Sequence, residues 1–123
     1  MTKPIASTER ELITQAVRDY FEGWFDADAE RMDRALHPEL VKRWPGGEQG
    51  ARLGITTKER MLELTEQGAG REDGADRSLD VRIEDMTADT ASVTVRSAVY
   101  HEYLHLVRTD AGWKIANALW RYA

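Results

Sequence analysis

The sequence predicts an α+β fold, with helices first along the chain and an antiparallel sheet after them. In the first half, apolar residues recur three and four positions apart, which is the period of an amphipathic helix. From about residue 78 onwards, apolar and polar residues alternate, and β-branched and aromatic residues become frequent, as in strands. Helices grouped in this way are expected to cover one face of the sheet.

The first helix is expected over about residues 8–25. Thr8, with a glutamate three positions later, is a capping-box pattern. The apolar face that follows becomes aromatic in its C-terminal half, where Tyr20 and Trp24 lie. Gly23 lies in the same half, where glycine costs about 1 kcal/mol relative to alanine. A close approach of another segment would explain that glycine.

Two shorter helices are expected next. An aspartate caps the second, over 29–36, and the proline of HPEL (37–40) ends it, because the residue before a proline avoids the helical conformation. A short extended piece, 41–44, and a loop, 45–54, then lead to a third helix over about 58–67.

About four antiparallel strands should follow. The alternation places them at 78–86, 92–95, 97–108 and 113–122, and TDAG (109–112) is a turn that makes the last two a hairpin.

The 123 residues suit a single domain spanning 1–123. The Gly- and Asp-rich run 68–78 is too short to link two domains and is expected to be a loop. A net charge of −5 argues against a nucleic-acid partner. The chain has no cysteine, which excludes disulfides and thiolate metal sites. Without a signal-like start or a long apolar run, we expect a cytoplasmic protein with no membrane contact.

HEYLH (101–105) matches the H-E-x-x-H motif of zinc metallopeptidases. That motif binds zinc because its histidines lie one helical turn apart. Here the flanking residues predict a strand, on which His101 and His105 would be about 13 Å apart. We therefore expect no metal site and no cofactor. A zinc hydrolase is kept as a remote alternative, which metal analysis of the purified protein would test.

The hairpin predicts which side chains share a face. With the turn centred on 110–111, opposing residues share one aliphatic face, which should meet the helices: Leu106 with Ile115, Leu104 with Asn117, and Glu102 with Leu119. The other face is aromatic and too large to remain in water, so we expect a homodimer through it. The residues of that expected interface are His101, Tyr103, His105, Trp120 and Tyr122.

Polar residues on the aliphatic face indicate a pocket. Asn117 and Glu102 would be buried there and would need hydrogen bonds or charged partners. Aromatic walls with a few converging polar groups are typical of ligand sites. The other residues expected to line it are Tyr20, Trp24, His37, Arg43 and Trp44.

Two blocks resemble a known family. YFEGWFDADAERMDRALHPELVKR (20–43) and EYLHLVRTDAGWKIANALW (102–120) are similar to the nuclear transport factor two-like superfamily, within it the putative lumazine-binding or SnoaL-like group. The resemblance implies a cone-shaped barrel, in which three helices pack on a strongly curved antiparallel sheet around a cavity. Members include isomerases, dehydratases and cyclases, and others that only bind or dimerise.

Each candidate has a functional and a structural interpretation. His37 is a general base or a residue that stabilises a helix C-terminus. Arg43 holds an anionic ligand or forms a surface ion pair. Tyr20 and Trp24 line a pocket or belong to the core. Asn117 donates to a ligand or is a satisfied core amide.

The function expected from these residues is binding of a small organic molecule, with acid–base lyase, isomerase or cyclase chemistry as its enzymatic form. In that scheme His37 takes a proton, Tyr20 and Asn117 donate to a developing oxyanion, and Arg43 holds an anionic end. The alternative is a non-enzymatic assembly module, whose cavity is filled by large side chains, namely Trp24, Trp44 and Met61.

Overall fold

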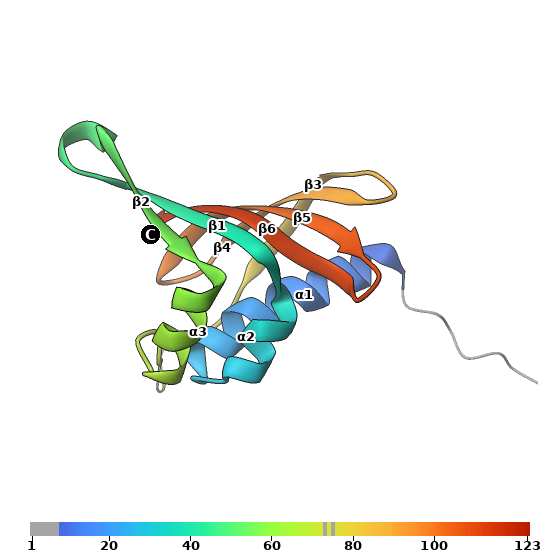
Figure 1. The fold of residues 1–123 in the computed structure, drawn as a ribbon, viewed down its shortest axis with the longest axis horizontal. Coiled ribbons are helices and arrows are strands. Elements are labelled where there is room, and N and C mark those ends of the chain that lie inside the picture. The colour runs from blue at the N-terminus through green and yellow to red at the C-terminus, as the bar shows by residue number, and fades with distance from the viewer. Residues whose placement is uncertain (1–7, 73, 75) are drawn as a thin grey trace, which may run out of the picture.

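Three helices lie on one face of a curved, open, six-stranded sheet (Figure 1). The computed structural model describes residues 8–72, 74 and 76–123. The helices are α1 (Glu9–Phe25), α2 (Ala29–Ala35) and α3 (Lys58–Glu66). The strands are β1 (Leu36–Gly46), β2 (Arg52–Thr57), β3 (Asp80–Met86), β4 (Thr90–Arg96), β5 (Tyr100–Thr109) and β6 (Gly112–Tyr122). The predicted α+β class is confirmed.

The helices begin at side-chain caps. Thr8 accepts a hydrogen bond from the backbone N–H of Glu11 at 3.1 Å, as the capping box predicts. Asp28 and Thr57 cap α2 and α3 in the same way. A Cβ on Gly23 would lie 3.0 Å from a backbone nitrogen of α2, so the close approach of the two helices explains that glycine.

The sheet has the order β2-β1-β6-β5-β4-β3 and is antiparallel except between β1 and β6, which are parallel. The segment expected as a short piece, 41–44, is the middle of the eleven-residue strand β1. The segment expected as a loop, 45–54, contains a tight turn and the start of β2. Strand β2 was not predicted from the sequence, because its apolar residues, Leu53 and Ile55, point outward and are exposed and do not mark a buried face.

The β5–β6 hairpin has a different register from the one predicted. Leu106 pairs with Ile115 as expected, but His105 pairs with Asn117, so Ala116 is an extra residue on β6. Such a β-bulge shifts every later residue of the strand to the opposite face.

Beyond the bulge, Ala118 and Trp120 lie on the inner face, toward the helices. Asn117 and Leu119 lie on the outer face and are exposed, so placing them inside was wrong. At the start of the same strand Trp113 is buried, and its indole N–H donates to Glu9 at 2.6 Å. This contact closes one end of the core between α1 and the sheet.

The core lies between the helices and the inner face of the sheet. It is formed by all three helices and by strands β1, β4, β5 and β6, with residues such as Phe21, Met32, Leu36, Leu104 and Ile115 fully buried. No described helix combines the length and the apolar character needed to cross a membrane. Of the predicted loop 68–78, residues 73 and 75 lie outside the described residues.

Candidate functional site

Three polar side chains lie together inside the core. Tyr20 and Glu102 are each 2% exposed, and Lys42 is 7% exposed. The Tyr20 hydroxyl donates to Oε1 of Glu102 at 2.8 Å and accepts a short hydrogen bond from Nζ of Lys42. Lys42 Nζ also lies 3.9 Å from Oε1 of Glu102. The three residues therefore form a continuous hydrogen-bonded chain, which we call the Lys–Tyr–Glu cluster.

Each member is placed there by the periodicity of its element. Tyr20 belongs to the buried stripe of α1. Lys42 lies beside Ala118 in the β1–β6 pair, and Glu102 lies beside Trp120 in the β5–β6 pair, all on the inner face. Because side chains alternate along a strand, the two charged groups face the helix and not the solvent.

Burial governs the protonation of the cluster. Burial raises the pKa of the Glu102 carboxyl, and the charge of Lys42 and the Tyr20 hydrogen bond only partly oppose it. Burial lowers the pKa of the Lys42 amine, against the attraction of Glu102. Burial, together with the charge of Glu102, raises the pKa of Tyr20, so that residue stays a neutral hydroxyl. The cluster is thus suited to exchanging protons internally.

Aromatic rings surround the Lys42 amine. Its Nζ lies 5.0 Å from the ring centre of Tyr20, 5.8 Å from that of Trp24 and 5.2 Å from that of Trp120. Cation–π attraction of this kind stabilises an ammonium group. Trp24 is fixed by a 2.9 Å hydrogen bond to the hydroxyl of Tyr100. The buried indole N–H of Trp120, by contrast, has no hydrogen-bond partner among the described residues.

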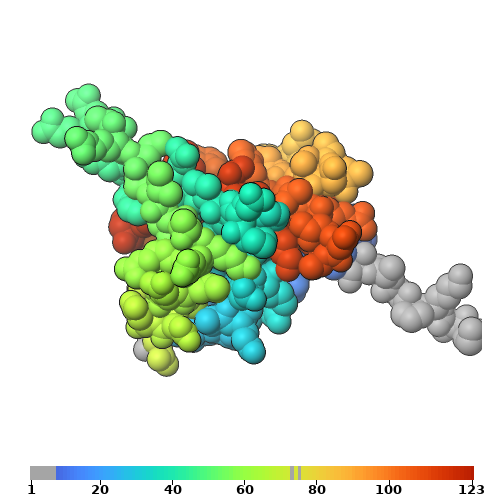
Figure 2. All heavy atoms as spheres, in the orientation of Figure 1, coloured from blue at the N-terminus to red at the C-terminus, as the bar shows by residue number. Residues whose placement is uncertain are grey.

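A hollow of about 600 Å³ adjoins the cluster. It lies under the end of the β1–β2 hairpin, which stands away from the body of the molecule (Figure 2). Trp120 lines this hollow, and its ring also lies against the Lys42 amine, so this side chain belongs both to the hollow and to the surroundings of the cluster. The lining residues are Trp44, Pro45, Gln49, Gly50, Trp120, Arg121 and Tyr122.

Two glycines make room for the tryptophans of the site. A Cβ on Gly54 would lie 2.0 Å from the ring of Trp44, and one on Gly70 would lie 2.1 Å from the ring of Trp24. Real side chains do not approach so closely, so each indole lies flat against a bare backbone. The orientation of both rings therefore depends on these glycines.

Of the residues predicted for the pocket, the structure brings together Tyr20, Trp24, Trp44 and Glu102. Arg43 is not among them, because it points to the outer face between Ile55 and Leu119. Asn117 is also outside, where its amide lies 3.4 Å from Nδ1 of His105. The predicted set His37, Tyr20, Asn117 and Arg43 is therefore not assembled in one place.

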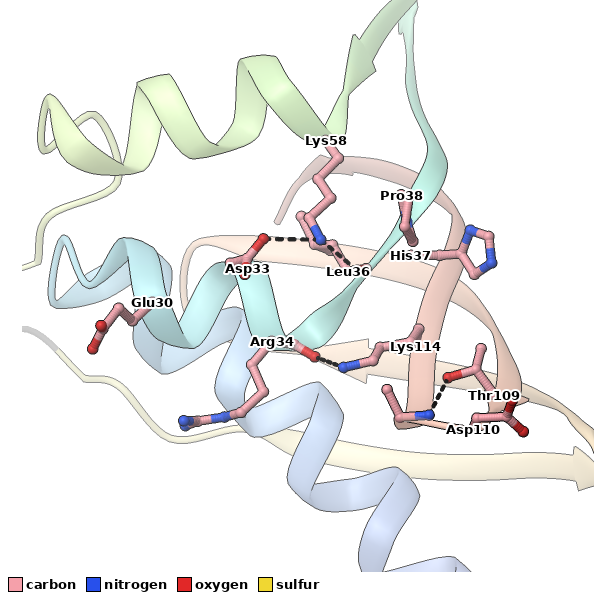
Figure 3. A pocket seen from close by; sticks show the side chains of 11 residues that line it. Glu30, Asp33, Arg34, Leu36, His37, Pro38, Lys58, Thr109, Asp110 and Lys114 are labelled. Carbon is pink, nitrogen blue, oxygen red and sulfur yellow. Dashed lines mark hydrogen bonds and ion pairs between the residues drawn. The ribbon is translucent and has the colours of Figure 1, made fainter.

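His37 lies in a different part of the molecule. It lines a groove of about 820 Å³ between α2, the start of β1 and the β5–β6 turn (Figure 3). Its Nδ1 accepts the backbone N–H of Glu39 at 3.0 Å. In the same groove, Lys58 bonds to the carbonyl of Leu36 and to Asp33, and Lys114 bonds to a carbonyl of α2. These contacts fix the start of β1 against the helices.

The expected dimer-interface residues do not all share one face. His101, Tyr103 and His105 lie on the outer face, on a strand, as the flanks of HEYLH predicted. Trp120 and Tyr122 lie on the inner side, where both pack against the ring of Tyr100. The bulge in β6 explains the difference. No group of three or more metal-ligating side chains occurs within residues 8–72, 74 and 76–123.

The pocket expected from the sequence included Arg43, and neither Lys42 nor Tyr100. A signal for Lys42 was present, since residues two apart on a strand share a face, which places Lys42 with Leu40 and Trp44. The expectation that Arg43 lines the pocket was wrong, because Arg43 lies on the outer face of the strand and Lys42 lies on the inner face. Tyr100 had a comparable signal, because it lies two residues before Glu102 and therefore shares its face of the strand.

A family model described as "Putative lumazine-binding" matches residues 8–121. The chain belongs to this family. No curated protein sequence matches it. The family's nuclear transport factor two-like fold is shared with solved structures whose descriptions differ from one another.

Three solved structures illustrate the similarity. An NTF-2-like protein of unknown function from Silicibacter pomeroyi has a TM-score of 0.71 at 15% identity, over 95% of this chain and 100% of that one. A ketosteroid isomerase-like protein from Erwinia carotovora atroseptica has a TM-score of 0.64 at 18% identity, over 95% and 98%. A protein from Novosphingobium aromaticivorans described as a putative aromatic ring hydroxylase has a TM-score of 0.68 at 15% identity, over 93% of this chain and 88% of that one. At these identities the likeness establishes the fold alone.

Proposed function

We propose that this member of the putative lumazine-binding family binds a small, flat organic molecule in the hollow that Trp120 lines, beside the Lys–Tyr–Glu cluster. The observation that carries the proposal is the buried Lys–Tyr–Glu cluster beside an aromatic hollow. A buried ion pair is seldom needed for stability, because apolar residues of similar volume commonly serve as well. A lysine and a glutamate inside the core are better explained by a ligand.

The two parts of the site suggest the shape of that ligand. Trp44, Trp120 and Tyr122 offer ring faces on which a planar molecule can stack. Lys42 and Tyr20 lie beyond Trp120 and would meet a carbonyl or other polar end. A flat heterocycle such as lumazine, which the family description mentions, has this combination of a ring face and polar edges.

The cluster also supports acid–base chemistry of the lyase, isomerase or cyclase type. Glu102, whose pKa is raised by burial, is suited to hold a proton and to exchange it with its neighbours. Tyr20 is a neutral donor that can stabilise a developing oxyanion, and Lys42 adds a positive charge next to it. These roles replace those first expected for His37, Asn117 and Arg43.

Lumazine binding tests the proposal. We expect lumazine to quench tryptophan fluorescence, and Tyr20→Phe to weaken its binding about tenfold, because one buried hydrogen bond to a charged group is lost. His37→Ala and Asn117→Ala, which alter residues outside the site, are the matched controls and should bind like the wild type. Absence of quenching, with no co-purified organic mass in native mass spectrometry, would contradict the proposal.

A second candidate, assembly without catalysis, is supported by the outer face of the sheet. Ile55, Leu119 and Tyr103 are 59%, 45% and 48% exposed and lie near one another across β2, β1, β6 and β5. Apolar surface of this kind is typical of an interface. We propose that two copies of the chain pack through it, which is compatible with either function.

A further inference from the structure

We propose that Lys42 is a nucleophile that forms an imine with an aldehyde or ketone bound in the hollow that Trp120 lines. The inference rests on the ligand site proposed above and names its substrate class. It starts from the placement of a lysine amine, a tyrosine hydroxyl and a carboxyl group in one hydrogen-bonded chain inside the core. A lysine desolvated in an apolar site is an activated nucleophile.

The hydrogen-bonded chain from Lys42 through Tyr20 to Glu102 can produce the neutral amine that the reaction needs. When Tyr20 passes its proton to Glu102 and takes one from Lys42, an ion pair becomes a neutral amine and a neutral acid, with no change in net charge. Where water is excluded, the neutral pair is favoured because no charge is left unsolvated. The burial that lowers the pKa of Lys42 and raises that of Glu102 acts in the same direction.

The reaction needs no oxidant or reductant. The Lys42 nitrogen attacks the carbonyl carbon, and the oxygen takes the Tyr20 proton, which Glu102 replaces. The new ammonium then returns a proton to Glu102, leaving a neutral carbinolamine. Glu102, acting through Tyr20, protonates the hydroxyl, which leaves as water while the nitrogen lone pair forms the C=N bond. The iminium proton returns to Glu102, so amine and carbonyl become imine and water.

Trp120 gives the carbonyl compound a route to the amine. The side chain of Lys42 is 9% exposed, against 2% for that of Glu102, so Lys42 lies nearer the surface of the cluster. The Trp120 ring lines the hollow and its centre lies 5.2 Å from the amine, and its N–H makes no hydrogen bond to another described residue. A displacement of this ring would break no hydrogen bond to a described residue, and we infer that it brings the hollow into contact with Lys42.

The other lysines provide internal controls, because the chain has only four. Lys58 donates to the Leu36 carbonyl and pairs with Asp33, and Lys114 donates to the Arg34 carbonyl. Both lie in the groove of Figure 3, away from the cluster. An imine there would reflect ordinary surface reactivity.

Reductive trapping tests the inference. The intact protein is incubated at pH 7 with benzaldehyde, or with propionaldehyde as an aliphatic carbonyl, and sodium cyanoborohydride, and peptide mapping locates the added group. Apart from the α-amine, we expect one benzyl group on Lys42, introduced about tenfold or more faster than at Lys58 or Lys114, because Lys42 alone has the Tyr20 hydroxyl beside it as a proton donor for the carbonyl oxygen. Lys42→Arg should abolish this label, and Lys58→Arg should leave it unchanged.

Tyr20→Phe is a second test, which remains informative if the Lys42→Arg protein does not fold. This variant keeps the lysine and the shape of the ring but interrupts the proton chain, so labelling of Lys42 should slow about tenfold while circular dichroism stays unchanged. Equal labelling of all lysines, or unchanged labelling in Tyr20→Phe, would overturn the inference.

Benzyl alcohol, which has the same ring but no carbonyl, separates this inference from the proposed function. If benzyl alcohol and lumazine quench tryptophan fluorescence but neither aldehyde is trapped on Lys42, the binding site stands and the imine is refuted. If neither compound binds and neither aldehyde is trapped, both proposals fail.

Discussion

Lys42 and Glu102 illustrate how a folded protein can hold ionisable groups where water does not reach them. In its charged form each group loses its hydration, at a cost of several kcal/mol after relaxation of the protein. Tyr20 satisfies one hydrogen bond of each, and three aromatic rings face the amine. The compensation is incomplete, because burial is the largest influence on the pKa of both groups.

The pH dependence of stability follows from these two directions. The folded state holds the Glu102 proton more tightly than the unfolded state, so stability falls as pH rises above the ordinary value of 4.5. The folded state releases the Lys42 proton more readily, so stability rises again as pH approaches the ordinary value of 10.5. Near neutral pH, Lys42→Met/Glu102→Gln should therefore be as stable as the wild type or about 1–4 kcal/mol more stable. Urea unfolding between pH 4 and 10 measures this.

The matched control is an exposed pair on α3. Arg60 and Glu63 form an ion pair at 3.0 Å with side chains 53% and 51% exposed. Arg60→Met/Glu63→Gln should change stability by about 1 kcal/mol or less, because exposed pairs contribute little. A wild type several kcal/mol more stable than Lys42→Met/Glu102→Gln at pH 7 would show that the cluster is chiefly a structural ion pair.

At the scale of elements, the β1–β2 hairpin shapes the mouth of the site. Its turn contains Gly47, Gln49 and Gly50 at positive φ, which bends the chain back so that β2 pairs with β1. Trp44 of β1 then lies over Gly54 of β2, with its ring centre 6.0 Å from that of Trp120. One wall of the hollow thus depends on a residue without a side chain.

Gly54→Ala should disturb this wall. The added Cβ would lie 2.0 Å from the Trp44 ring, so the indole must leave its place. We expect a loss of about 1–3 kcal/mol of stability, as in other overpacked sites, and a shift of tryptophan emission to longer wavelength. Gly46→Ala is the control, since its Cβ would lie an ordinary 3.7 Å from the nearest atom. Equal effects of the two substitutions would contradict the packing described here.

The bulge at Ala116 is the other element that determines the site. It brings Ala118 beside Lys42 and Trp120 beside Glu102, both on the inner face. A regular hairpin would have placed Leu119 and Asn117 there instead. A β-bulge increases the local bend of a strand, which suits a sheet that curves over helices.

The whole molecule presents two faces with different chemistry. The helices cover the inner face, and the outer face of the sheet is open in a single chain (Figure 1). Ile55, Leu119 and Tyr103 are exposed on that outer face. The proposed homodimer would cover these side chains.

Leu119→Glu tests the dimer at this scale. A charge at the centre of this surface should make the protein monomeric at micromolar concentration, because the interface would have to desolvate a carboxylate, a cost that the neighbouring Arg43 offsets only in part. Leu12→Glu is the matched control, since Leu12 is 43% exposed on α1, which covers the inner face and not the outer face. Native mass spectrometry and light scattering report the state. A monomeric wild type would refute the dimer.

The sequence by itself determined the class of fold and most of its elements. Capping residues and the two periodicities are local signals, and they located the three helices and the strands from β3 onwards. They also placed Tyr20, Trp24, Trp44 and Glu102 at the site, because alternation and helical stripes fix which residues face the core. The strand interpretation of HEYLH is confirmed for the same reason.

Only the tertiary structure decided which polar groups meet. The parallel pairing of β1 with β6 joins residues far apart in sequence, and it brings Lys42 beside Ala118, near Tyr20 and Glu102. One extra residue in β6 moves Asn117 out and Trp120 in. Neither event leaves a local signal, since a bulge changes the register without changing the composition of a strand. A periodic sequence fixes the two faces of each element, whereas pairing with distant strands fixes which of those faces form the site.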